Sequence, residues 1–292
     1  MNKRLIYPQW MLLAPLLLYF LLFLLPGLLG VFFAFTDWNV RSAGEINFVG
    51  LQNFREIFTG TTVRYSQGII NTLRFTLVSN IVKIIPSLFL AILLSSGLKG
   101  RNIYRTILYM PSILPFLIIG LVFNAILSFN GLLNNLFESL GLAHWQLKWL
   151  SDPNIVWYSI YGVDAWRGIG YVMTIFLASI NAIPRSYYEA AEIDGANFFQ
   201  RLRHITLPMI SGAITINLVF GITYGLKVFD IVYVLTNGGP GRASEVITTY
   251  SYQLYAQGRY GMATAMNTIL LMLTLLLGLL IVRWMTKKEV QH

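Results

Sequence analysis

Residues 11–36 read MLLAPLLLYFLLFLLPGLLGVFFAFT, a predominantly apolar stretch without a single charged side chain. A helix needs about 20 residues to cross the hydrocarbon core of a bilayer, so this stretch is long enough to span it. A secretory signal peptide has a shorter apolar core that is followed by a small-residue cleavage site. The stretch is therefore predicted to be a retained transmembrane helix.

Five further stretches of the chain are comparably long and apolar. They lie near residues 72–98, 105–129, 155–180, 209–234 and 261–284. Each is predicted to be a helix, because hydrocarbon offers no partners for backbone polar groups and a helix satisfies them internally. The predicted fold class is all-α. Residues 1–292 are predicted to form a single polytopic membrane domain with six transmembrane helices.

The composition of the chain agrees with an exterior that faces lipid. Of its 292 residues 11% are charged and 56% are hydrophobic, whereas a soluble domain carries about 25% charged residues. The net charge of +9 would suit nucleic acid, but the cations are scattered between apolar runs and form no patch with interleaved aromatic residues. The partner expected from composition is membrane lipid and not nucleic acid.

The distribution of lysine and arginine predicts the orientation of the chain. One side of the predicted membrane collects eleven of them: Lys3, Arg4, Lys99, Arg101, Arg105, Arg185, Arg201, Arg203, Arg283, Lys287 and Lys288. The other side collects six, although its loops are longer: Arg41, Arg55, Arg64, Lys148, Arg242 and Arg259. Because the cytoplasmic side carries the excess of these residues, both termini are predicted to be cytoplasmic.

The predicted spans contain no set of residues that suits catalysis or metal binding. His144, His204 and His292 all lie outside the spans, and the chain has neither a cysteine nor a phosphate-loop motif. The chain is therefore predicted not to be an enzyme. No catalytic residue, metal ligand or cofactor of its own is assigned.

Residues 181–208 connect the fourth and fifth predicted spans on the cytoplasmic side. Ser186 and Glu189 have the spacing of a capping box, which predicts a short helix that begins there. Gly195 can end that helix in the left-handed conformation, a second amphipathic turn follows, and Pro208 closes the segment. From the residues alone this is either an ordinary interfacial helix or a docking helix.

The residues of this loop resemble the "EAA" loop of the permease subunits of bacterial ATP-binding-cassette importers. The resemblance runs over 20 residues, from Glu189-Ala190-Ala191 through Gly195 to Ile205-x-Leu207-Pro208. It implies the fold of type I importer permeases and a coupling helix that docks on a cytoplasmic ATPase. The residues expected to couple to the ATPase are Glu189, Ala190, Ala191, Asp194, Gly195, Ile205, Leu207 and Pro208.

Other segments resemble the sugar branch of this family, the maltose and glycerol-phosphate type. The resemblance is carried by Asp230, by Thr236-Asn237-Gly238-Gly239-Pro240, by Tyr250 and Tyr252, and by Gly261. It implies a bacterial inner-membrane importer that works by alternating access. The implied partners are a second permease subunit in a heterodimer, a dimer of ATPase subunits that binds ATP and Mg, an extracellular or periplasmic solute-binding protein, and a sugar substrate.

Two faces inside the predicted bundle could line the path of a substrate. In the fourth span Asp164, Arg167, Gly168 and Tyr171 share one helix face by their spacing, and the fifth span adds Thr223, Tyr224 and Lys227. Aromatic rings and hydrogen-bonding groups suit a sugar. By resemblance, Gly168, Tyr171 and Tyr224 fall on sugar-contacting positions. The alternative for the charges is a buried pair of Asp164 with Arg167, and a Lys227 that snorkels.

Two other functions stay open at this point. The first is a permease for another solute delivered by a binding protein, such as a glycerol phosphodiester. The second is a secondary transporter, which would need ion-titrating residues near the middle of the membrane. Asp164 is the only acidic residue deep in a predicted span, and secondary transport would leave the loop at 181–208 without a purpose.

Overall fold

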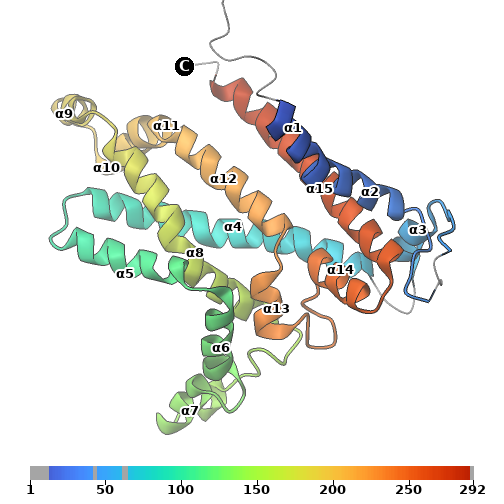
Figure 1. The fold of residues 1–292 in the computed structure, drawn as a ribbon. Helices are drawn as coiled ribbons and strands as arrows, with labels where there is room; N and C mark the ends of the chain where they lie inside the picture. Colours follow the sequence, from blue (N-terminus) through green and yellow to red (C-terminus); the bar gives the residue numbers. More distant parts are fainter. Residues whose placement is uncertain (1–12, 42–44, 61–64, 290–292) are drawn as a thin grey trace, which may run out of the picture. The chain divides into compact units, whose positions relative to one another are not determined.

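The computed structural model describes residues 13–41, 45–60 and 65–289 (Figure 1). Within these ranges every regular element is helical, and an isolated antiparallel bridge joins Thr36 to Phe48. The predicted all-α class is confirmed. The chain packs as two compact units, one of residues up to Ser66 with Tyr250–Met272 and one of Gln67–Thr249 with the residues from Leu273 onward.

The first unit is held together by contacts to backbone carbonyls. Its elements are α1 (Leu13–Tyr19), a π-helical turn (Phe20–Leu24), α2 (Leu25–Phe33), α3 (Gln52–Thr59), most of α14 (Ile247–Ala256) and the start of α15 (Tyr260–Glu289). Asn53 on α3 donates hydrogen bonds to the carbonyls of Ala34 and Thr36, over 2.9 and 2.8 Å. Gly261 lies so close to Thr36 that a Cβ on it would come within 2.2 Å of the Thr36 carbonyl oxygen.

The second unit contains the predicted pathway and the predicted coupling loop. Its elements are most of α4 (Tyr65–Ser95), then α5 (Arg101–Ile113), α6 (Phe116–Leu127), α7 (Leu132–Ser139), a 3₁₀ turn (Ala143–Trp145), α8 (Val156–Asn181), α9 (Arg185–Ile193), α10 (Phe198–Arg201), a π-helical turn (Leu202–Thr206), α11 (Leu207–Met209), α12 (Ser211–Leu226) and α13 (Asp230–Thr236). Figure 1 shows α9 and α10 beyond the end of α8.

Helix α4 has its polar side chains inside and its apolar side chains outside. The buried polar residues recur about once per turn: Thr72, Thr76, Asn80, Lys83 and Ser87. Exposed apolar side chains occupy other positions: Leu77, Ile81, Ile85 and Phe89. This is the reverse of a soluble amphipathic helix. It is the arrangement expected of a helix with lipid on one side and a polar interior on the other.

Four helical stretches of the described residues are long and apolar enough to cross a membrane. They are Leu13–Phe33, Tyr65–Ser95, Phe116–Ser139 and Tyr260–Leu280. Two bent pairs raise the number to six if each pair is one span: Val156–Asn181 with Arg185–Ile193, bent by 69°, and Phe198–Met209 with Ser211–Leu226, bent by 66°. The structure thus supports a polytopic membrane protein with four to six spans.

Two predicted spans are interrupted in the structure. The span expected at 105–129 is broken into α5 and α6, because Leu114 is extended ahead of Pro115 and the residue before a proline disfavours helical geometry. The span expected at 209–234 is broken between α12 and α13. There the carbonyl of Val228 accepts a hydrogen bond from the Thr248 hydroxyl instead of a helical N–H.

Candidate functional site

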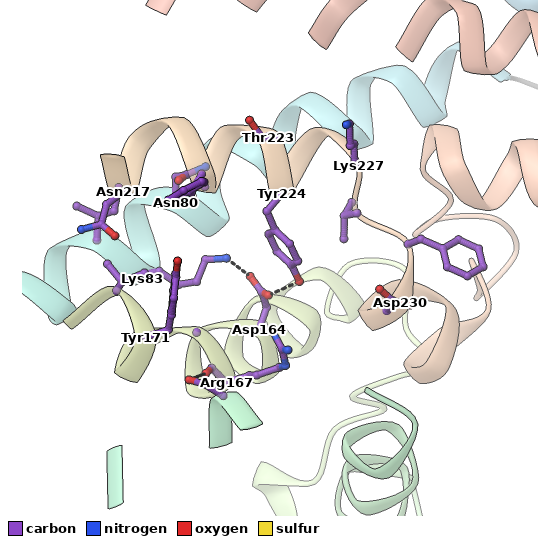
Figure 2. Close-up of a pocket in the computed structure, with 18 of the residues that line it drawn as sticks. Asn80, Lys83, Asp164, Arg167, Tyr171, Asn217, Thr223, Tyr224, Lys227 and Asp230 are labelled. Atoms are coloured by element: carbon purple, nitrogen blue, oxygen red, sulfur yellow. Dashed lines mark hydrogen bonds and ion pairs between the residues drawn. The ribbon is translucent and has the colours of Figure 1, made fainter. Parts of the chain in front are cut away.

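A cavity of about 530 Å³ lies in the second unit among side chains of α4, α8 and α12 (Figure 2). All the residues predicted for the substrate pathway line it: Asp164, Arg167, Gly168, Tyr171, Thr223, Tyr224 and Lys227. In the adjoining core the ring of Tyr161 stacks with the rings of Phe75 and Trp157, and Phe75 also contacts the ring of Tyr224. Residues from helices far apart in the sequence therefore form one cavity.

The carboxylate of Asp164 organises the centre of the cavity. Its Oδ2 lies 2.9 Å from Nζ of Lys83 and also accepts a hydrogen bond from the Ser79 hydroxyl. Its Oδ1 accepts a hydrogen bond of 2.8 Å from the Tyr224 hydroxyl. Asp164 is 2% exposed and Lys83 is 6% exposed. A charge buried this deeply requires such partners, and both oxygens of Asp164 have them.

The alternative of a buried pair of Asp164 with Arg167 is not formed, and Lys83 pairs with Asp164 instead. The guanidinium of Arg167 lies instead over the ring of Phe116, with its Cζ 3.9 Å from the ring centroid. Lys83 reaches Asp164 across α8 because Gly168 has no side chain. A Cβ on Gly168 would lie 2.6 Å from Cδ of Lys83. The glycine therefore supplies space for the lysine stem, a role that its sequence position did not indicate.

The predicted residues do not all face the same part of the cavity. Figure 2 shows Tyr224 directed toward Asp164, whereas Thr223 and Lys227 lie on the side of α12 that is turned away from it. The Thr223 hydroxyl is used within its own helix, where it donates to the carbonyl of Val219 over 2.8 Å. Lys227 is exposed at the end of α12.

The loop predicted for coupling forms a helix, a corner and a second helix. Gly195 ends α9 with a φ of +73°. The N–H of Ala196 donates to the carbonyl of Ala191, and the N–H of Gly195 donates to that of Glu192. These two hydrogen bonds make the glycine-terminated C-cap that the sequence predicted, in which a side chain at Gly195 would be strained.

The start of α9 and the end of the loop differ from the sequence prediction. No capping box forms between Ser186 and Glu189, because Pro184 occupies the N-cap and Ser186 already lies inside the helix. A capping box forms on α10 instead, between Asn197 and Gln200. Pro208 does not close the segment either, since it lies within α11.

The residues predicted for coupling separate into an exposed group and an anchored group. Five lie on the free surface or at its edge: Glu189, Ala190, Ala191, Asp194 and Gly195. The neighbouring Ile193 is 88% exposed. Ile205 and Leu207 instead pack against the buried cluster that contains Phe176 and Ile210. The first group can contact a partner, whereas Ile205 and Leu207 hold the loop to the helix bundle.

Residues 83–290 match the family described as the binding-protein-dependent transport system inner membrane component. The chain belongs to this family. The permease is 32% identical to a trehalose/maltose transport system permease protein of Thermococcus litoralis, over 91% of its own length and 89% of the relative. It is also 32% identical to the arabinooligosaccharides transport system permease protein of Bacillus subtilis, over 91% and 85% of the two chains.

A solved structure resembles the permease over nearly its whole length. It is a chain of a bacterial ABC transporter involved in the import of the acidic polysaccharide alginate, and it matches with a TM-score of 0.82 and 26% identity. The match covers 95% of the permease and 94% of that chain. Fold and family thus agree with the resemblance found in the loop, and they favour an ABC importer over a secondary transporter.

The pathway predicted from the sequence leaves out several polar residues of the cavity, among them Asn80, Lys83, Ser112, Asn217 and Asp230. The repeat of polar residues along α4 could have indicated Asn80 and Lys83. Asn217 lies in an apolar stretch of α12. The one feature of the sequence that could have indicated it is a polar residue within a predicted span. Asn217 is 2% exposed, and within the described part of the chain neither end of its amide has a hydrogen-bond partner.

Proposed function

We propose that the permease forms half of the translocation pathway of an ATP-driven importer for a sugar or oligosaccharide. The observation that carries the proposal is the cavity among α4, α8 and α12. Aromatic rings, a buried charge network and an unpartnered amide meet there in one space. A sugar needs apolar surface for its ring faces and donors and acceptors for its hydroxyls. The transport names of the relatives support the same class of solute.

Within this cavity the residues have different proposed roles. Tyr171 is partly exposed and offers a ring face. Tyr224 offers its ring, while its hydroxyl is held by Asp164. Asn217 offers a donor and an acceptor that are both free. Lys83 and Gly168 position the Asp164 carboxylate, and they act on the substrate through it.

In the proposed assembly the permease has three kinds of protein partner. A second permease subunit completes the pathway as a heterodimer, and a dimer of ATPase subunits binds ATP and Mg²⁺ on the cytoplasmic side. A periplasmic or extracellular binding protein delivers the solute. Both termini of the permease are cytoplasmic, in a bacterial inner membrane. The permease itself performs no catalysis and binds no cofactor.

Coupling is proposed to run through α9. When ATP closes the ATPase dimer, the coupling helices of the two permeases move together, and the cavity opens outward to receive the sugar. Hydrolysis returns it to the inward-open state. The exposed Glu189 is proposed to pair with a cation of the ATPase. The exposed Ala190 allows a close approach of the two proteins.

An acidic solute, such as an acidic sugar or a glycerol phosphodiester, is the second candidate. Among the described residues neither Arg167 nor Lys227 has a carboxylate partner, although both line the cavity. A planar guanidinium suits a carboxylate or phosphate group. This candidate keeps the importer mechanism and changes only the charge of the cargo.

The test is to reconstitute the permease with its partner subunits and its binding protein, and to measure ATP turnover with neutral and acidic sugars. Stimulation by neutral oligosaccharides supports the first candidate. Stimulation by acidic sugars alone, lost in Arg167→Gln, supports the second. An importer that responds to neither class and to an amino acid or a metal ion instead would contradict the proposal.

A further inference from the structure

A second cavity, of about 410 Å³, lies in the second unit beside the coupling loop. It is bounded by the last turns of α4 and α8, the first turn of α5, and α9 with α10. None of the proposed pathway residues line it. The cavity therefore lies between the ends of the long helices and α9, the helix that is proposed to contact the ATPase.

The charged side chains that line this cavity are all cationic: Arg101, Arg185 and Arg201. Within the described residues no carboxylate pairs with any of the three. The acidic residues of α9, among them Glu189, do not line the cavity. Three arginines without a counter-charge, gathered around one concave space, favour an anionic occupant.

The uncharged lining suits an oxyanion as well. Asn181 at the end of α8 adds an amide, whereas the Ser95 hydroxyl donates to the carbonyl of Ile92 within α4. α5 begins at Arg101 and α9 begins at Arg185, and neither helix has a side-chain cap at its N-terminus. The N–H of Arg101 already donates to the carbonyl of Leu98, so the first turn of α9 is the one whose N–H groups can meet an anion.

We infer that this cavity binds a phosphate group, which Arg101, Arg185 and Arg201 hold with charge-assisted hydrogen bonds. Arginine is suited to this task because its planar fork matches phosphate geometry. The phosphate belongs either to the headgroup of an anionic phospholipid or to a free phosphorylated solute. In both cases its binding ties α9 and α10 to α4, α5 and α8, so it stabilises the coupling loop in one position.

The test uses the importer purified with its partner subunits and stripped of lipid. Phosphatidylglycerol, phosphatidylcholine and inorganic phosphate are titrated separately, and binding is followed by native mass spectrometry for the lipids and by the shift in melting temperature for phosphate. The test variant is Arg101→Gln with Arg201→Gln. The matched control is Lys99→Gln with Arg203→Gln, which removes the same two charges from exposed positions that do not line the cavity.

The wild type and the control should bind a phosphate ligand, and the test variant should bind it at least about tenfold more weakly, since hydrogen bonds between charged groups are among the strong ones. Binding of phosphatidylglycerol but not of phosphate identifies a lipid headgroup as the source. Binding of phosphate without lipid preference identifies a free solute. If the double variant does not assemble, Arg101→Gln and Arg201→Gln are titrated singly with the same expectation. No binding by the wild type, or equal weakening in the control, would overturn the proposal.

Discussion

At the scale of single residues, the cavity depends on one buried ion pair and its neighbours. Lys83 and Asp164 come from different helices and meet where Gly168 leaves space. Sequence reasoning placed Asp164 correctly inside the bundle. The alternative that it left open, a pair with Arg167, is wrong, because spacing along one helix identifies Arg167 as a neighbour but cannot identify a lysine that approaches from another helix.

Removal of one member of this pair should destabilise the permease strongly. Lys83→Met or Asp164→Leu leaves an uncompensated buried charge, which costs about 3–5 kcal/mol, whereas the double variant should lose much less than the sum. Lys227→Met is the control, since Lys227 is exposed and unpaired in the described chain. Thermal unfolding in detergent measures the stability of all four variants: the two single variants, the double variant and the control. Additive losses in the double variant would show that the pair does not interact.

Two buried asparagines should respond in opposite directions to the same change. Asn217 has no hydrogen-bond partner, whereas Asn71 donates to the carbonyls of Ala243 and Glu245. Asn217→Leu should keep or raise stability and lower uptake, because an unpaired buried amide costs about 1–3 kcal/mol and a ligand would satisfy it. Asn71→Leu should lower stability. Normal uptake in Asn217→Leu would remove this residue from the proposed site.

At the scale of elements, the sequence predicts the long apolar helices better than their ends, and it does not predict the short helices α3, α7 and α14. Apolar length identifies each span, because length and hydrophobicity are what a bilayer requires. The break at Pro115 could have been predicted from the proline rule. The break after Leu226 could not, because it depends on a hydrogen bond from Thr248 to the carbonyl of Val228. The capping box predicted at Ser186 is absent for a local reason. Pro184 occupies the N-cap, so the helix begins at Arg185, one residue before Ser186.

The packing of α5 against α8 requires a glycine. A Cβ on Gly170 would lie 1.9 Å from the backbone oxygen of Leu108, whereas nothing lies within 4 Å of the position at Gly212. Gly170→Ala should therefore lower stability by about 1–3 kcal/mol or more, because the backbone cannot move aside easily. Gly212→Ala should stabilise by up to about 1 kcal/mol. The melting temperatures of the two variants in detergent test this prediction. Equal shifts of the melting temperature in Gly170→Ala and Gly212→Ala would contradict this packing.

At the scale of the whole molecule, the distribution of lysine and arginine predicts the orientation of the permease in the membrane. The chain has no cysteine, so Ser139→Cys on α7 and Ser186→Cys on α9 are unique labels at exposed positions. A membrane-impermeant thiol reagent is added to cells whose outer envelope lets it pass and whose cytoplasmic membrane is intact. The reagent should label position 139 and not position 186. Labelling of position 186 alone would show that the orientation is opposite to the predicted one.

ATP-driven motion is proposed to reach the permease through α9 and the corner at Gly195. Because Glu189 does not cap its helix, Glu189→Gln and Glu189→Ala should weaken coupling to a similar degree. Gly195→Val adds strain at a φ of +73° that a branched residue resists. The deciding measurement is solute-stimulated ATP hydrolysis by the reconstituted importer that carries Gly195→Val with Glu189→Ala. We predict that the complex assembles and that stimulation is lost. Full stimulation in an assembled complex would contradict the account, because the proposed coupling element would then be dispensable.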